Sequence, residues 1–273
     1  MKIDFRWLYS QAKDNRTKNF LKILEAKSIY VDRNDRFAIV SNSQRFPLKL
    51  GNHKIWLNKE NSVYSLDIYM ELFKERHHSK LSSFLPNKND IVIDVGANEG
   101  YYVLKTKEIA PSSKIIAVEP NPTAFGILKK NVEANKLKNI ILLSKAITSR
   151  NGRIKFEIVK GRSEVGAVNV YKKFRKRGRL KKITVNSITL EKLCKKYKID
   201  KIDILKIDVE GSEVDILKSS KSILSKVDKA IIEYHNAQKT KEKVIKLMNN
   251  NNFKLVKIDD QKFYGDLYFI RKD

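Results

Sequence analysis

The chain has 273 residues, and its 57 Lys and Arg against 31 Asp and Glu give a formal net charge of +26. Hydrophobic residues make up 41%, which excludes a wholly disordered chain. No apolar run approaches the ~18 residues of a membrane-spanning helix, and the first residues lack the apolar stretch of a signal peptide. The lone Cys194 excludes an internal disulfide framework. We therefore expect a soluble, cytoplasmic protein.

Residues 1–85 are expected to form an N-terminal extension of helices and short strands. The spacing of apolar residues predicts one helix over 16–27 and a second over 65–77. Between them lie short apolar runs separated by Asn and Gly, which are typical of β-strands, at 37–40, 46–50 and 54–57.

From residue 86 the pattern changes to strands that alternate with helices, one of which begins at Asn121 followed by Pro122. Buried-type strands are predicted at 91–95, 114–119, 140–143, 202–208 and 230–234. Two more, near 254–258 and 267–270, are expected to close as an antiparallel hairpin. The alternation predicts an α/β domain over 86–273 with a doubly wound, Rossmann-like, seven-stranded sheet. Ligands of such sheets bind beyond the carboxyl ends of the strands.

A basic insertion interrupts this domain at about residues 152–190. Its segment 171–182 holds eight Lys or Arg in twelve residues, with Tyr171 and Phe174 interleaved and no acid. Three interpretations stay open for this segment: a grip on the phosphates of RNA or another polyanion, a contact with an anionic membrane surface, or a solvated hairpin. The high net charge itself fits either a polyanionic partner or coding bias.

The loop after the strand at 91–95 carries the most information about chemistry. It reads Asp94-Val95-Gly96-Ala97-Asn98-Glu99-Gly100-Tyr101. Gly96 permits a tight turn close to a ligand, Asn98 tolerates a left-handed backbone, and Gly100 lets the next helix pack closely. Glu119 ends the following strand, where an acid accepts hydrogen bonds from both hydroxyls of a ribose.

Three nucleotide-type cofactors compete for this loop. The GxxxxGK[ST] pattern of a phosphate-binding loop is absent, and the glycine spacing is not the GxGxxG of a dinucleotide site. Asp94 and Glu99 also place negative charge where a pyrophosphate would lie. A cofactor without phosphate and with a cationic sulfonium fits better, and S-adenosylmethionine is such a cofactor.

At these residues the chain resembles the FkbM-type methyltransferases, over about residues 85–270. The resemblance is carried by residues 94–102, 118–122, 131, 189–191, 205–213 and 233–235, although Glu191 stands where the family usually has Asp. It implies a class I S-adenosylmethionine-dependent enzyme that methylates a hydroxyl oxygen. It also implies that Gly96, Asn98 and Gly100 line the methionine end, that Glu119 holds the ribose, and that Asn121 and Ala146 lie near the adenine. The expected cofactor-binding residues are Asp94, Gly96, Ala97, Asn98, Gly100, Tyr101, Glu119, Pro120, Asn121, Ala146 and Asp208.

The acceptor side is expected at the end of the strand 202–208. An alcohol acceptor needs positioning and a base. Lys206, Asp208 and Glu210 alternate and would face one side of an extended segment, where Lys206 would keep Asp208 ionised. Asp208 could be the base, a positioner or a ligand to a divalent ion; two acids are thin evidence for a metal, so none is expected. Glu210 could instead cap the next helix. His235 can act as a base near neutral pH or be structural. The candidate catalytic residues are Asp208, Lys206, Glu210 and His235.

Three functions follow from these observations. The first is O-methylation of a hydroxyl on a glycan, lipid or small molecule. The second is RNA 2′-O-methylation with the basic surface as the grip, although such enzymes often use a Lys-Asp-Lys-Glu set and residues 233–235 supply no Lys. The third is a non-catalytic module that binds nucleic acid or a partner, against which the intact loop and Glu119 argue.

Overall fold

The structure is a computed structural model, and it describes residues 3–29, 44–60, 62–75, 81–159, 162–167, 180–235, 238–261 and 264–272. The strand expected at 37–40 lies outside the described residues, as does the basic segment 171–182 apart from its last three residues. Within the described part, no helix combines the length and apolarity that crossing a membrane requires.

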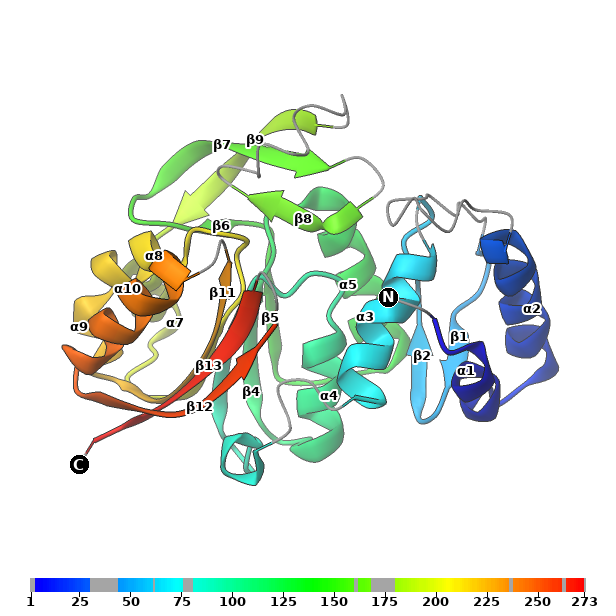
Figure 1. Cartoon of the computed structure of the whole chain (residues 1–273), viewed down its shortest axis with the longest axis horizontal. Helices are drawn as coiled ribbons and strands as arrows, with labels where there is room; N and C mark the ends of the chain where they lie inside the picture. Colours follow the sequence, from blue (N-terminus) through cyan, green and yellow to red (C-terminus); the bar gives the residue numbers. More distant parts are fainter. Residues whose placement is uncertain are drawn as a thin grey trace.

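A seven-stranded sheet runs through the centre of the molecule in the order β12-β13-β11-β10-β3-β4-β5 (Figure 1). Its strands are β3 (Ile91–Val95), β4 (Lys114–Val118), β5 (Ile140–Leu143), β10 (Ile202–Ile207), β11 (Val227–His235), β12 (Phe253–Asp260) and β13 (Tyr264–Arg271). The first five pair in parallel, whereas β13 is antiparallel to both β11 and β12. The predicted doubly wound sheet with an antiparallel C-terminal hairpin is therefore confirmed. The strand order reverses at β3, which lies between β4 and β10.

Both faces of this sheet are buried because its strands are apolar on both sides. On β4, for example, Ile115 and Ala117 join one hydrophobic cluster, and Ile116 and Val118 join the other. The first cluster includes residues of α4 (Tyr101–Ile109) and α5 (Pro122–Ala134). The second includes residues of α7 (Leu190–Tyr197), α8 (Glu213–Ser219), α9 (Lys221–Leu224) and α10 (Gln238–Asn249). Helices thus cover the sheet from both sides, as Figure 1 shows.

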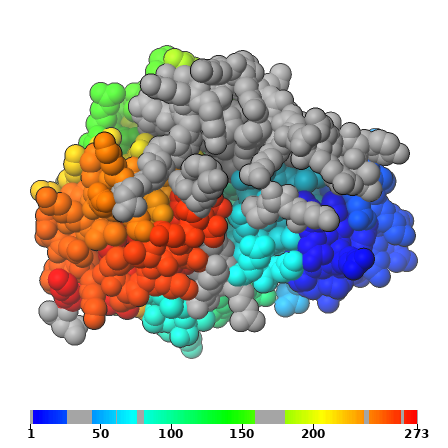
Figure 2. Space-filling model, in the orientation of Figure 1, coloured from blue at the N-terminus to red at the C-terminus, as the bar shows by residue number. Residues whose placement is uncertain are grey.

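The N-terminal elements form a further layer outside α4 and α5. They are α1 (Phe5–Gln11), α2 (Asn15–Ile29), β1 (Leu48–Leu50), β2 (His53–Ile55), α3 (Ser62–Phe73) and the 3-10 helix η1 (Ser82–Phe84). The two predicted helices are confirmed as α2 and α3; α1 was not expected, although Asp4 caps it by accepting the N–H of Trp7. This layer shares one hydrophobic cluster with the sheet, from Leu8 and Leu24 to Ile204 and Tyr268. Figure 2 shows it, in blue and cyan, beside the orange and red C-terminal strands and helices.

The insertion builds a second sheet above the first one. Its strands are β6 (Ala146–Ile147), β7 (Gly152–Val159), β8 (Arg162–Ala167) and β9 (Leu180–Ile188), in the order β6-β9-β7-β8. Of the basic segment, Lys181 and Lys182 belong to β9, and the ammonium of Lys182 lies 3.6 Å from Glu157.

Candidate active site

The loop after β3 makes the tight turn that its residues predict. Gly96, Asn98 and Gly100 all have a left-handed backbone, with φ of 86°, 47° and 86°. A Cβ on Gly96 would lie 1.7 Å from the backbone oxygen of Asp208, and one on Gly100 would lie 2.4 Å from the side chain of Leu128 on α5. No side chain fits at either position. The loop therefore lies directly against the residue that follows β10, where the strand order reverses.

Glu119 follows β4, and its two carboxylate oxygens accept backbone N–H groups from the loop and from the start of α5. Its Oε2 accepts the backbone N–H of Asn98 at 2.9 Å, and its Oε1 accepts that of Asn121 at 2.7 Å. Burial raises the pKa of Glu119 to about 8, against the opposing effect of these two hydrogen bonds. Asn121 caps α5 as predicted, since its side chain accepts the N–H of Thr123. The next strand leads to Ala146, which is buried on β6.

The N-terminal layer braces this loop from behind. The side-chain amide of Asn131 on α5 donates to the carbonyl of Glu99 at 2.8 Å, and its oxygen accepts the N–H of Trp56 at 2.6 Å. The hydroxyl of Tyr101 donates to the carboxylate of the fully buried Glu99 at 3.0 Å. The ring of Tyr101 packs edge-on against Tyr69 of α3. Tyr101 is expected among the cofactor-binding residues, and its side chain lies in the contact between the loop and the N-terminal layer.

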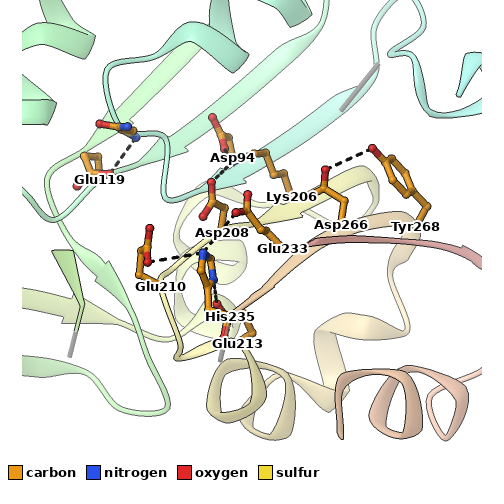
Figure 3. A network of polar contacts seen from close by, with 11 residues as sticks. Asp94, Glu119, Lys206, Asp208, Glu210, Glu213, Glu233, His235, Asp266 and Tyr268 are labelled. Carbon is orange, nitrogen blue, oxygen red and sulfur yellow. Dashed lines mark hydrogen bonds and ion pairs between the residues drawn. The ribbon is translucent and has the colours of Figure 1, made fainter. Parts of the chain in front are cut away.

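Lys206 on β10 lies between two carboxylates of the site (Figure 3). Its ammonium is 3.4 Å from Asp94 and 3.2 Å from Asp208. Burial works to lower the pKa of Lys206, but the charges of Asp208 and Asp94 outweigh it and raise that pKa. The predicted pairing of Lys206 with Asp208 is confirmed, and it also includes Asp94 at the end of β3. Lys206 is thus a buried cation that links two neighbouring strands.

Glu210 does not continue the alternation that the sequence suggested. Strand β10 ends at Ile207, and Glu210 has a left-handed backbone with φ of 55°. This turn brings its carboxylate to 3.6 Å from Nε2 of His235 rather than to the side of Lys206. At the start of α8, the N–H of Gly211 donates to Glu213, and the N-cap residue Ser212 makes no capping hydrogen bond through its side chain. The alternative that Glu210 caps this helix stays a prediction.

His235, at the end of β11, is surrounded by carboxylates. Its Nδ1 lies 2.8 Å from Glu213, and its Nε2 lies 3.3 Å from Glu233 and 3.6 Å from Glu210. Burial works to lower the pKa of His235, but Glu210, Glu213 and Glu233 raise it well above its ordinary value. An imidazole that is already protonated on both nitrogens cannot accept a proton.

Glu233 joins the site, although the sequence pattern does not place it among the candidate catalytic residues. It lies two residues before His235 on β11, so both side chains point to the same face of the strand. Burial first, and then the charge of Asp208, raise the pKa of Glu233. One ligand-type atom from each of Asp208, Glu233 and His235 lies within 4.8 Å of the others. Acidic groups from the ends of two adjacent strands thus meet beside the loop.

The sequence profile of the Methyltransferase FkbM domain matches residues 94–255, which include the loop, Glu119 and this acidic cluster. The chain belongs to the FkbM methyltransferase family. The protein is an S-adenosyl-L-methionine-dependent methyltransferase. Its site fits this cofactor, because the loop lies at the carboxyl ends of the strands and the buried Glu119 supplies a carboxylate where a ribose acid is expected.

Two relatives of known name are 25% and 29% identical to this methyltransferase over the aligned residues. The 2-O-methyltransferase NoeI of Sinorhizobium fredii is 25% identical over 171 residues, covering 59% of this chain and 70% of NoeI. The hexuronic acid methyltransferase AglP of Haloferax volcanii is 29% identical over 164 residues, covering 59% of this chain and 62% of AglP. Among solved structures, a methyltransferase FkbM from Methylobacillus flagellatus aligns over 97% of this chain and 57% of its own, at 14% identity and a TM-score of 0.48.

Proposed function

We propose that this methyltransferase transfers a methyl group to a hydroxyl oxygen of a sugar-type acceptor. The observation that carries the proposal is the meeting of Asp208 and Glu233 at the carboxyl ends of β10 and β11, directly beside the loop at Gly96. A hydroxyl needs a group that takes its proton as the new C–O bond forms, and carboxylates in this position can do so. The names of NoeI and AglP, a 2-O-methyltransferase and a hexuronic acid methyltransferase, support the same class of acceptor.

On this proposal, the residues around the loop hold the cofactor. Gly96, Ala97, Asn98 and Gly100 present backbone to its methionine end, and Glu119 accepts hydrogen bonds from its ribose. The adenine lies near Asn121, with Pro120 and Ala146 beside it. When bound, the cofactor supplies a methyl group that is already activated on a cationic sulfur. The chain therefore has to position the acceptor, exclude water and accept one proton.

The acceptor hydroxyl gives its proton to a carboxylate rather than to His235. The three carboxylates around His235 favour its charged form, so the hypothesis of His235 as the base loses its support. Asp208 and Glu233 are the candidates for the proton acceptor. Lys206 holds Asp208 in place, and burial raises the pKa of Glu233, which makes its carboxylate a stronger base.

The same geometry gives less support to RNA as the acceptor. Lys206 is buried between Asp94 and Asp208, and the end of β11 offers Glu233 and His235 where a second Lys would be needed. The residues that could grip RNA, within 171–182, lie mostly outside the described part of the chain.

The test is transfer of labelled methyl from S-adenosyl-L-methionine into an extract of the source cells. The extract is divided into untreated, RNase-treated and glycosidase-treated portions, and Asp208→Asn measures the background. We expect label that survives RNase, is released by glycosidases and resists mild alkali, because an ether is stable in alkali and a methyl ester is not. Label that disappears with RNase, or that alkali releases as methanol, contradicts the proposal.

A further inference from the structure

The cluster at the ends of β10 and β11 has the composition of a metal site as well as that of an acid–base site. Asp208, Glu233 and His235 each offer one donor atom, and all three atoms lie within 4.8 Å of one another. Two donors are carboxylate oxygens and one is an imidazole nitrogen, and they come from two strands that are paired in parallel. Figure 3 shows the three side chains pointing toward one another beneath Lys206 and Asp94.

The spacing of two of these atoms, on His235 and Glu233, suits a shared ion, and the atom of Asp208 lies within 4.8 Å of both. Donors that bind one ion at bonds of about 2.1 Å lie roughly 3.0 to 3.4 Å apart when adjacent, and about 4.2 Å apart when opposite. Nε2 of His235 is 3.3 Å from Oε1 of Glu233, within the adjacent range. Oε2 of Glu210, at 3.6 Å from the same nitrogen, lies close enough to add a further oxygen.

The other nitrogen of His235 provides an independent observation. A histidine that binds a metal usually donates its second N–H to a carboxylate, which fixes the ring and its tautomer. Nδ1 of His235 lies 2.8 Å from Oε1 of Glu213, a side chain with no exposed surface. Glu213 is itself oriented by the N–H of Gly211. The ring is thus held from behind, with Nε2 directed at Glu233 and Glu210.

The charges of the cluster favour a cation at this point. Among the described residues, the ion pairs of the site join five carboxylates to two basic side chains, Lys206 and His235. Lys206 lies on the side toward Asp94, and the carboxylates of Glu210 and Glu233 lie near Nε2 of His235. A divalent cation would offset their mutual repulsion.

We propose that Asp208, Glu233 and the Nε2 atom of His235 bind a divalent cation that also takes the acceptor hydroxyl as a ligand. The ion displaces the proton that Nε2 carries in the ligand-free site, because a metal binds only the deprotonated nitrogen. The donor set, one imidazole with carboxylates, suits an ion such as Mn²⁺ that accepts both nitrogen and oxygen. The inference rests on the proposed function, because it concerns how the same site activates the hydroxyl. A bound cation would lower the pKa of a coordinated hydroxyl. Asp208 and Glu233 would each bind the ion through one oxygen, and the hydroxyl proton would pass to the second oxygen of one of these carboxylates.

The test measures metal binding separately from catalysis. The full chain is treated with EDTA, dialysed and titrated with Mn²⁺, with the free ion followed by electron paramagnetic resonance. We expect one bound ion per chain, with a nitrogen coupling from imidazole in the pulsed spectrum of the wild type. Glu213→Gln should weaken binding by about 10- to 100-fold, and Glu233→Gln and His235→Gln by at least as much. Competition with Mg²⁺ and Zn²⁺ then ranks the metals.

Asp228→Asn is the matched control, because Asp228 lies on the same strand at the other end and pairs with Lys201. It should bind Mn²⁺ like the wild type. A variant that also loses S-adenosylhomocysteine binding is set aside as misfolded. In that case the nitrogen coupling in the wild-type spectrum decides whether His235 binds the ion. Three results would overturn the metal site and leave the proposed function standing. They are the absence of tight Mn²⁺ binding, Mn²⁺ binding without nitrogen coupling, and equal methyl transfer before and after EDTA. Mn²⁺ bound at these residues without transfer to any hydroxyl supports the site and contradicts the proposed function.

Discussion

Replacement of Glu119 by Gln tests the assignment of the cofactor site most directly. The substitution keeps the size of the side chain and removes its charge. The carbonyl oxygen of Gln can keep one of the two backbone N–H groups that Glu119 accepts, at Asn98 and Asn121, while its amide faces the other. A hydrogen bond to a charged group contributes about 1.5–3 kcal/mol. We therefore expect Glu119→Gln to weaken binding of S-adenosylhomocysteine by about 10- to 150-fold at 25 °C.

Isothermal titration calorimetry with two ligands separates a ribose contact from an effect on the loop. The second ligand is S-adenosylhomocysteine without its two ribose hydroxyls. If Glu119 binds the ribose, the variant should lose much less affinity for this second ligand than for the first. Equal losses for both ligands would show that Glu119 acts only through the loop, and an unchanged affinity for the first ligand would remove Glu119 from the site.

The same carboxylate predicts a pH dependence. The pKa of Glu119 is raised to about 8 without ligand, and a carboxylate that accepts ribose hydroxyls must be ionised, so binding releases a proton below that pH. Affinity should then rise by up to about tenfold per pH unit until it levels off above pH 8, and it should be flat in Glu119→Gln. The carboxyl of Glu119 has a pKa near 4.5 in the unfolded chain and a raised pKa in the ligand-free fold. Protonation of Glu119 therefore stabilises the ligand-free fold below pH 4.5, and this contribution to the free energy of unfolding is lost as the pH rises toward 8. Thermal melts of wild type and variant across this range measure the difference.

Three further predictions use the neighbouring residues. Gly96→Ala should abolish cofactor binding, measured by calorimetry, because its Cβ would collide with the backbone oxygen of Asp208 and the φ of this residue is positive. Gly126→Ala is the control, since its Cβ would enter open space on α5. It should raise the free energy of unfolding by about 0.5–1 kcal/mol, measured from melting curves. Asp208→Asn should keep binding of S-adenosylhomocysteine and lower kcat by about 10²- to 10⁴-fold, and a near-normal kcat would exclude Asp208 as proton acceptor or ligand. Asn131→Leu should cost about 2–4 kcal/mol of unfolding free energy, since it leaves buried groups of the loop and β2 without partners; Asn135→Leu, whose bonds to Lys54 are exposed, should cost less than about 1 kcal/mol in the same denaturant titration.

The sequence alone determined most of the sheet strands and the backbone turn of the loop, because both depend on local patterns. Runs such as 91–95 and 140–143 are apolar on both faces and bounded by turn residues, and they form β3 and β5 as predicted. Gly96, Asn98 and Gly100 adopt the left-handed backbone that few other residues allow, and Asn121 caps α5. Each of these features is set by the conformational preferences of a residue and its near neighbours.

The acidic cluster was decided by the tertiary structure. Asp208 and Glu233 meet because β10 pairs with β11. Strand β10 also pairs with β3, and there the backbone N–H of Ile91 donates to the side chain of Asp203, 112 residues away. Glu210 left the expected side of the strand because its backbone turns left-handed after β10 ends. Tyr101 turned toward the N-terminal layer because its ring fills the core there and its hydroxyl satisfies the buried Glu99. A local pattern shows that a strand is buried and where it ends, but the choice of its neighbours depends on how all the layers pack, and that choice decides which side chains share a site.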